Sequence, residues 1–251
     1  MLLLVLAALL AQGAPPRPGP PPTAQLPSEG PAGWKERFDE LWKKRDQPGV
    51  EKQLNAILKE TLSADPGSFE ANWRQASLFN WQANGAEGEF KAGLGKAAWT
   101  AGDKAITAKA EDVRGHYNSG VGVGLYSEGV GILTALSQGL EGKFRDRLLA
   151  AVRIDKDYLD GGPQVVWGRY FYKLPWPKRD VGESIKVLSE VVKTHPANLR
   201  AKIYLADSLA EDGKGDEAKK LVQEVLDAKP GDDPPEDKRL RDMAKRWIAS
   251  H

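Results

Sequence analysis

The chain has 251 residues, no cysteine, and a formal net charge of +1 from 36 basic and 35 acidic residues. The well-mixed charges argue against a nucleic-acid groove, which needs clustered positive charge. The lack of cysteine excludes disulfides, thiolate metal sites and a catalytic thiol.

The first 13 residues have the features of a signal peptide. Residues 2–10 are apolar, a run that is too short to cross a bilayer as a helix but suits the core of a secretory leader. Cleavage is predicted after Gly13 or Ala14, and an uncleaved apolar tail is the alternative. Residues 14–32 are rich in proline, which predicts a disordered linker. We therefore expect a periplasmic or secreted location.

A 34-residue interval separates Pro196 from Pro230. Between them, apolar residues recur at helical spacing before and after the turn sequence EDGKGDE. A helix pair of this length, with small residues at fixed positions, is typical of a tetratricopeptide repeat. With both prolines at repeat position 32, Ala206 lies at position 8 and Ala218 at position 20, where small side chains let the two helices approach. A generic helical hairpin is the alternative.

The same register recurs upstream with longer turns. Its small residues at position 8, spaced by 44, 48 and 38 residues, are Ala76, Gly120, Gly168 and Ala206. Repeats of this kind bury their apolar faces only by stacking on one another. We predict an all-α, tetratricopeptide-repeat-like solenoid of about four helix pairs, forming one domain over residues 33–251. A capping helix is expected over residues 235–249, with its basic residues on the solvated face.

Catalytic and metal-binding motifs are missing from the sequence. The three histidines, His116, His195 and His251, do not have the paired spacing of metal ligands. The glycine-rich stretch NSGVGVGLYSEGVG, which contains Gly120 and Gly124, follows a predicted helix rather than a strand. Close helix packing is therefore favoured over a phosphate-binding loop. We predict no enzymatic activity, no cofactor and no metal.

The first helix of each repeat is predicted to line a concave groove. Its groove-facing positions hold a mixture of aromatic and polar side chains, namely Trp73, Arg74, Ser77, Asn80, Trp81, Tyr117, Asn118, Arg169, Tyr172, Tyr204 and Asp207. This mixture suits a ligand that is part apolar and part polar. Trp73 and Trp81 are expected to hold an apolar body, and Arg74 an anionic or carbonyl head. Aromatic residues that serve only as core are the alternative.

Motifs in the C-terminal half carry a family resemblance. They are DGGP at residues 160–163, GRY at 168–170, a Leu-Pro break at 174–175, Gly182, and the HPAN repeat end at 195–198. With them, roughly residues 50 to 230 resemble the T-component family of TRAP transporters, which are helical proteins made of degenerate tetratricopeptide repeats. The resemblance implies a periplasmic protein that pairs with a solute-binding component and helps to capture small, partly hydrophobic ligands. The order GLEGKFRDRLLAAVRIDKDY…GRYFY is also similar to a repeat family that includes regulators of microtubule dynamics.

Two functions from different classes fit this sequence. The first is a non-enzymatic, extracytoplasmic repeat protein whose groove binds a partner protein or a small amphipathic ligand, as an accessory component of TRAP-type uptake. The second is a structural adaptor in a cell-envelope complex. A ligand-binding solenoid predicts a closed aromatic pocket, whereas an adaptor predicts an open groove. The expected partner is a protein, with a periplasmic solute-binding protein as one candidate and a second copy of the chain as another. No nucleic acid and no membrane span in the mature chain are expected.

Overall fold

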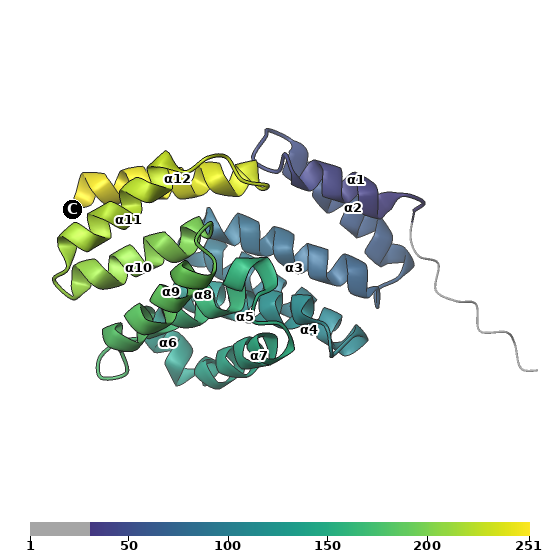
Figure 1. Cartoon of the computed structure of the whole chain (residues 1–251). Helices are drawn as coiled ribbons and strands as arrows, with labels where there is room; N and C mark the ends of the chain where they lie inside the picture. Colours follow the sequence, from purple (N-terminus) through teal and green to yellow (C-terminus); the bar gives the residue numbers. More distant parts are fainter. Residues whose placement is uncertain (1–30) are drawn as a thin grey trace, which may run out of the picture.

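The computed structural model describes residues 31–251, which form α helices and connecting loops without a strand (Figure 1). The all-α prediction is confirmed. The helices of this part are α1 (Trp34–Trp42), α2 (Val50–Ala64), α3 (Phe69–Asn84), α4 (Gly88–Ala108), α5 (Val113–Val130), α6 (Ile132–Ser137), α7 (Leu140–Ile154), α8 (Tyr158–Lys173), α9 (Val181–Thr194), α10 (Leu199–Glu211), α11 (Gly215–Asp227) and α12 (Pro234–Ser250). The predicted signal peptide, and the predicted linker up to residue 30, lie outside the described residues.

The helices stack in pairs into one curved solenoid (Figure 1). The four predicted pairs are α3–α4, α5–α7, α8–α9 and α10–α11, and α1–α2 forms a further pair in front of them. The short helix α6 is inserted between α5 and α7 and accounts for one of the long turns. Helix α12 packs on α10 and α11 close to the predicted capping position. No described helix is long and apolar enough to span a membrane.

Side-chain caps fix where several helices begin. Ser68 and Asn198 each accept a hydrogen bond from the backbone N–H three residues later, and Asp180 and Asp233 do the same. A cap of this kind stabilises a helix by about 1 kcal/mol, because it satisfies a backbone donor that has no partner within the helix. The HPAN repeat end is therefore the start signal of α10.

The predicted repeat register is present in the structure. All four small residues at position 8 are buried. A Cβ atom added to Gly120 would lie 2.5 Å from Cδ2 of Leu148, and one added to Gly168 would lie 2.6 Å from Cγ of Leu188. Both leucines occupy repeat position 24 on the second helix of their pair. In these two repeats position 8 is glycine because the partner helix inserts a leucine there.

Ala206 occupies the same position on α10 and is fully buried. Replacing Ala206 by leucine is expected to lower the free energy of unfolding by about 1–3 kcal/mol, because extra methyl groups overpack the contact with α11. Asp212→Leu is the control, since Asp212 is exposed in the α10–α11 turn and should change stability far less. Urea denaturation of both variants measures the difference, and equal losses would contradict the register.

The glycine-rich helix α5 packs against α4 with almost no space between the two backbones. A Cβ atom on Gly122 would lie 2.5 Å from the backbone nitrogen of Trp99, and one on Gly95 would clash with the backbone nitrogen of Tyr126. Two further glycines, seven residues along each helix, make the same kind of contact, namely Gly102 and Gly129. The interpretation of this stretch as a close helix contact is confirmed.

The curvature of the solenoid brings its two ends together (Figure 1). The start of α12 contacts the turn between α1 and α2, and we call this contact the seam. Arg45 Nη2 pairs with Asp233 Oδ2 at 2.7 Å, and Lys238 Nζ pairs with Asp46 Oδ2 at 3.0 Å. Arg45 is only 3% exposed, so its ion pair is shielded from solvent on the arginine side.

The hydrophobic core does not continue across the seam. One buried cluster joins α1, α2 and α3. A second joins the four helices from α4 to α7, and a third joins the helices from α8 to α12. None of these clusters contains residues from both α12 and the α1–α2 pair. The closure of the solenoid therefore rests on ion pairs, hydrogen bonds and cation–π contacts.

A candidate ligand-binding cavity

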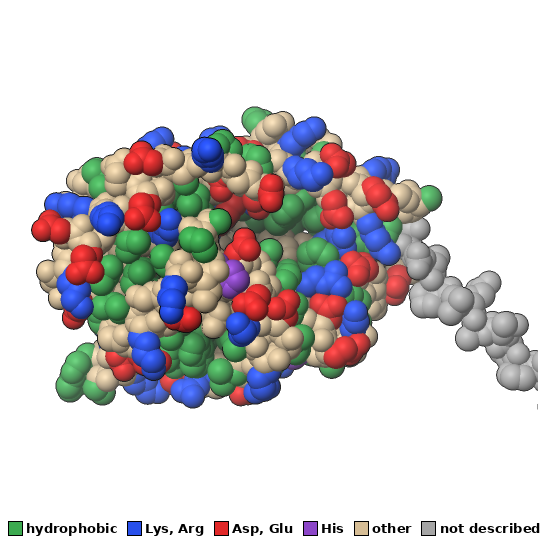
Figure 2. Space-filling view, viewed as in Figure 1, with side chains coloured by type: hydrophobic (Ala, Val, Ile, Leu, Met, Phe, Trp, Pro, Cys, Tyr) green, Lys and Arg blue, Asp and Glu red, His purple; other side chains and the backbone are tan. Residues whose placement is uncertain are grey.

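The closed solenoid surrounds a cavity of about 810 Å³ on its concave side. Figure 2 shows the surface hollowed between the α1–α12 edge and the helices below it. The cavity is lined mainly by the first helices of the repeats, α3, α5, α8 and α10, together with α6 and the start of α7. Helices α4, α9 and α11 contribute no lining residue. The repeat geometry places the second helices on the convex side, and α7 is the exception because its start reaches the cavity.

Most of the predicted groove residues line this cavity. They are Trp73, Ser77, Asn80, Trp81, Tyr117, Asn118, Arg169 and Tyr204. The three that do not line it are Arg74, Tyr172 and Asp207. The helical spacing used for the prediction identifies the face of each helix, but the three exceptions lie at the edges of that face.

Arg74 does not line the cavity and is held by two carboxylates, one of which, Asp39, does line it. Its Nε and Nη2 atoms pair with the two oxygens of Asp39 at 3.0 and 3.1 Å, and Nη1 pairs with Glu70 at 2.5 Å. Its side chain is 8% exposed. Because two acidic residues already match its charge, the expected role of Arg74 as the holder of an anionic head is not what the structure shows.

Tyr172 and Asp207 support Arg169, which does line the cavity. Asp207 pairs with Arg169 Nη1 at 2.6 Å and accepts a hydrogen bond from Trp247 Nε1 at 2.9 Å. The ring of Tyr172 lies 4.5 Å from the Arg169 guanidinium. These contacts join α8, α10 and α12, so the two residues hold the wall in place from behind.

A polar strip on α3 and α5 forms one side of the cavity. Ser77 Oγ donates to Asn118 Oδ1 at 3.0 Å, and Asn80 Nδ2 donates to the Asn118 carbonyl at 3.0 Å. The Oδ1 atom of Asn80 is buried and accepts no hydrogen bond from any described residue. A buried acceptor without a donor costs about 1–3 kcal/mol, so this atom weakens the packing of α3 against α5.

Aromatic side chains form the apolar part of the cavity wall. The rings of Tyr117 and Tyr158 meet edge to face, with centroids 5.4 Å apart. Burial raises the pKa of Tyr117 and raises that of Tyr158 to about 12. Both phenols therefore stay neutral at physiological pH. Trp73 lines the same cavity, is half-buried, and donates its Nε1–H to Glu70 at 2.9 Å.

A charged pair lies where α10 meets α12. Arg200 pairs with Glu236 and donates to the Tyr204 hydroxyl at 2.9 Å. Burial by itself would raise the pKa of Glu236, but the Arg200 guanidinium outweighs it and keeps that pKa low. The pair is therefore fully ionised near neutral pH, and it places matched charges at the cavity wall.

Several lining residues were not predicted from the sequence. They are Phe38, Phe144, Tyr158, Arg200, Glu236 and Arg239. Arg200 precedes the predicted Tyr204 by four residues and shares its helix stripe, so that signal was present. Glu236 and Arg239 lie on α12, whose basic residues were expected to face solvent. Nothing local in the sequence shows that α12 would reach the other end of the solenoid.

The chain is similar to one family model and to solved structures. Residues 178–236 match the tetratricopeptide repeat family model. The chain has a tetratricopeptide-repeat-like fold. No curated protein matches the sequence. Two crystal structures of MamA are similar: one has a TM-score of 0.43 at 15% identity, covering 77% of this chain and 91% of MamA. The other has a TM-score of 0.45 at 18% identity, covering 76% and 92%.

Proposed function

We propose that this protein is a non-enzymatic scaffold that binds a segment of a partner protein in its concave cavity. The observation that carries the proposal is the cavity itself, which is formed mainly by the first helices of successive repeats and combines aromatic rings with a polar strip. Tetratricopeptide repeats present such concave surfaces for extended binding. An apolar side chain of the partner would pack among Trp73, Tyr117 and Tyr158, while its backbone would lie against the polar strip of α3 and α5.

A small amphipathic ligand is the second candidate occupant, and the closure of the solenoid favours it. Ligand cavities for small molecules measure roughly 300–1,000 Å³, and this cavity of about 810 Å³ falls in that range. A closed aromatic pocket is also what the sequence analysis expected of a ligand-binding solenoid rather than of an open adaptor.

We further propose that the protein acts outside the cytoplasm as an accessory component of TRAP-type uptake, with a periplasmic solute-binding protein as its partner. The support comes from the T-component resemblance and from the leader-like N-terminal sequence. Genes for transporter membrane subunits beside this gene would strengthen this assignment.

Photo-crosslinking from inside the cavity tests the binding proposal. Benzoylphenylalanine at position 117 should give a defined covalent adduct in cells, because Tyr117 lines the cavity. The same group at Thr100, which is exposed on α4, is the control. A protein adduct specific to position 117 supports the scaffold, and a low-mass adduct supports the amphipathic ligand. Adducts at position 100 alone would overturn both.

A further inference from the structure

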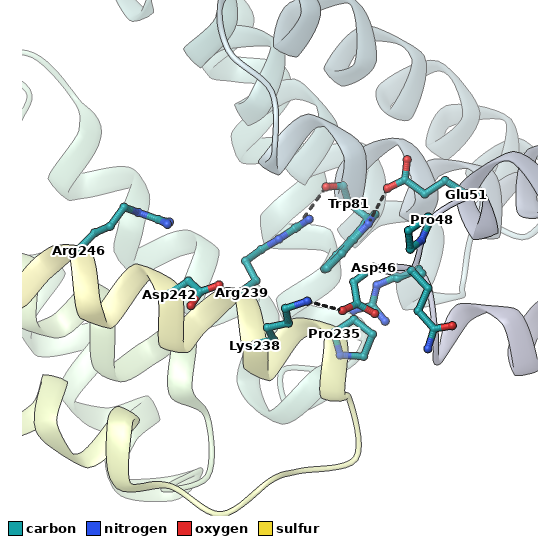
Figure 3. A pocket seen from close by; sticks show the side chains of 12 residues that line it. Asp46, Pro48, Glu51, Trp81, Pro235, Lys238, Arg239, Asp242 and Arg246 are labelled. Carbon is teal, nitrogen blue, oxygen red and sulfur yellow. Dashed lines mark hydrogen bonds and ion pairs between the residues drawn. The ribbon is translucent and has the colours of Figure 1, made fainter.

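A second cavity, of about 530 Å³, lies at the seam (Figure 3). It is lined by the α1–α2 turn and by one face of α12. Three side chains, Arg45, Trp81 and Arg239, line this seam pocket and the central cavity as well. They therefore stand between the two cavities.

The indole of Trp81 lies between two guanidinium groups. The ring centroid is 4.1 Å from Arg45 and 3.2 Å from Arg239. Arg45 has Asp233 as its counterion. Arg239 donates one hydrogen bond to the Trp81 carbonyl at 3.1 Å but makes no ion pair with any described residue. A positive charge that is withdrawn from water without a counterion is costly.

The surroundings of Arg239 add to that cost. Burial lowers the pKa of Arg239 to about 10. The negative charge of Glu236 raises this pKa, but the nearby cations Arg200 and Arg45 lower it and so offset part of that effect. Arg246 lies seven residues further along α12, two turns away on the same face, and also makes no ion pair with any described residue. Two unpaired guanidinium groups thus line the same pocket.

The carboxylates that line the seam pocket are already engaged. Asp46 pairs with Lys238, and Asp242 pairs with a neighbouring lysine on α12 at 3.3 Å. Glu51 accepts a hydrogen bond from Trp81 Nε1 at 2.9 Å, which Figure 3 shows beside the Arg239 contact. Glu51 has only neutral donors among the described residues and keeps its charge, but Arg239 and Arg246 are two guanidinium groups without an ion pair there, so the unpaired charge of this pocket is in positive excess.

We propose that the seam pocket is a binding site for a small oxyanion, with Arg239 as its principal ligand and Arg246 supporting it. The planar guanidinium group fits phosphate and carboxylate groups, to which it donates two parallel hydrogen bonds. An anion held there would supply the missing counterion of Arg239. The site shares Arg239 with the wall of the central cavity but uses none of Trp73, Asn80, Tyr117 and Tyr158, so it does not depend on the proposed function.

Inorganic phosphate is the probe for this site. Its addition should raise the melting temperature of the wild-type protein above that in sodium chloride of equal ionic strength, because a ligand of the native state stabilises it. Titration calorimetry should show phosphate binding at least tenfold weaker in Arg239→Gln. Lys219→Gln removes an exposed basic residue of α11 that neither lines the pocket nor pairs with a carboxylate that does, and should leave phosphate affinity unchanged.

Arg246→Gln keeps the test valid if Arg239→Gln fails to fold. Arg246 is exposed and should tolerate substitution, so a severalfold loss of phosphate affinity is expected without a loss of stability. The proposal is overturned if phosphate gives no gain over chloride in the wild type. It is also overturned if Arg239→Gln, or Arg246→Gln where the first variant is unfolded, binds phosphate as the wild type does.

Discussion

Replacing Gly95 by alanine is expected to lower the free energy of unfolding by about 1–3 kcal/mol, the usual cost of overpacking a core. A Cβ atom at this position would meet the backbone nitrogen of Tyr126, which cannot rotate away as a side chain can. Helices α4 and α5 would have to separate, and the contacts at Gly102 and Gly122 would loosen with them. Urea denaturation followed by circular dichroism measures the loss.

Gly93 provides a control on the same helix. It is exposed two residues away, and a Cβ atom added there meets no atom within 4 Å. Alanine at this position should therefore stabilise the protein by about 0.5–1 kcal/mol, because it favours the helix without a steric cost. Two identical substitutions on α4 are thus expected to have opposite signs. The same sign for both would mean that the α4–α5 contact is looser than described.

Replacing Trp81 by alanine is expected to lower the free energy of unfolding by about 3–5 kcal/mol, as for other large aromatic residues in a core. The indole is 8% exposed, belongs to the cluster formed by α1, α2 and α3, and is stacked between two guanidinium groups. Its removal leaves a void beside two cations and opens the seam. Urea is the suitable denaturant, since it does not screen the ion pairs as a guanidinium salt would.

Trp73 is the matched comparison, because it lines the same cavity but is only half-buried. Trp73→Ala should cost less than half as much stability as Trp81→Ala. It should also weaken the binding of 1-anilinonaphthalene-8-sulfonate, an amphipathic dye that fluoresces in apolar cavities. Equal stability losses for the two variants, with unchanged dye binding in Trp73→Ala, would assign both tryptophans to the core.

The helix pairs were predictable because their signals are local. The proline interval, the small residues at position 8 and the cap at Asn198 all lie within one repeat of the elements that they specify. The first helix of each repeat faces the concave side, so the same register placed Tyr117 and Asn118 on the cavity wall. The register did not indicate the role of Arg74, because its counterion Asp39 lies on another helix and spacing along α3 says nothing of it.

The seam was not predictable because it depends on the sum of all the repeat rotations. Asp46 and Lys238 are 192 residues apart, and no pattern around either residue indicates that they meet. The basic face of α12 is typical of a solvated helix, and several of its residues, such as Lys245, are indeed exposed. Only the accumulated curvature of the preceding helix pairs brings Arg239 over the ring of Trp81.

Closure also limits how this protein can vary. An open array of repeats can gain or lose a unit and keep its remaining contacts, because each unit touches only its neighbours. Here an added helix pair would carry Asp233 and Lys238 away from Arg45 and Asp46, and a deleted pair would drive the two ends into collision. The number of repeats is therefore fixed by the geometry of the first and last of them, as the number of segments is fixed in any closed ring.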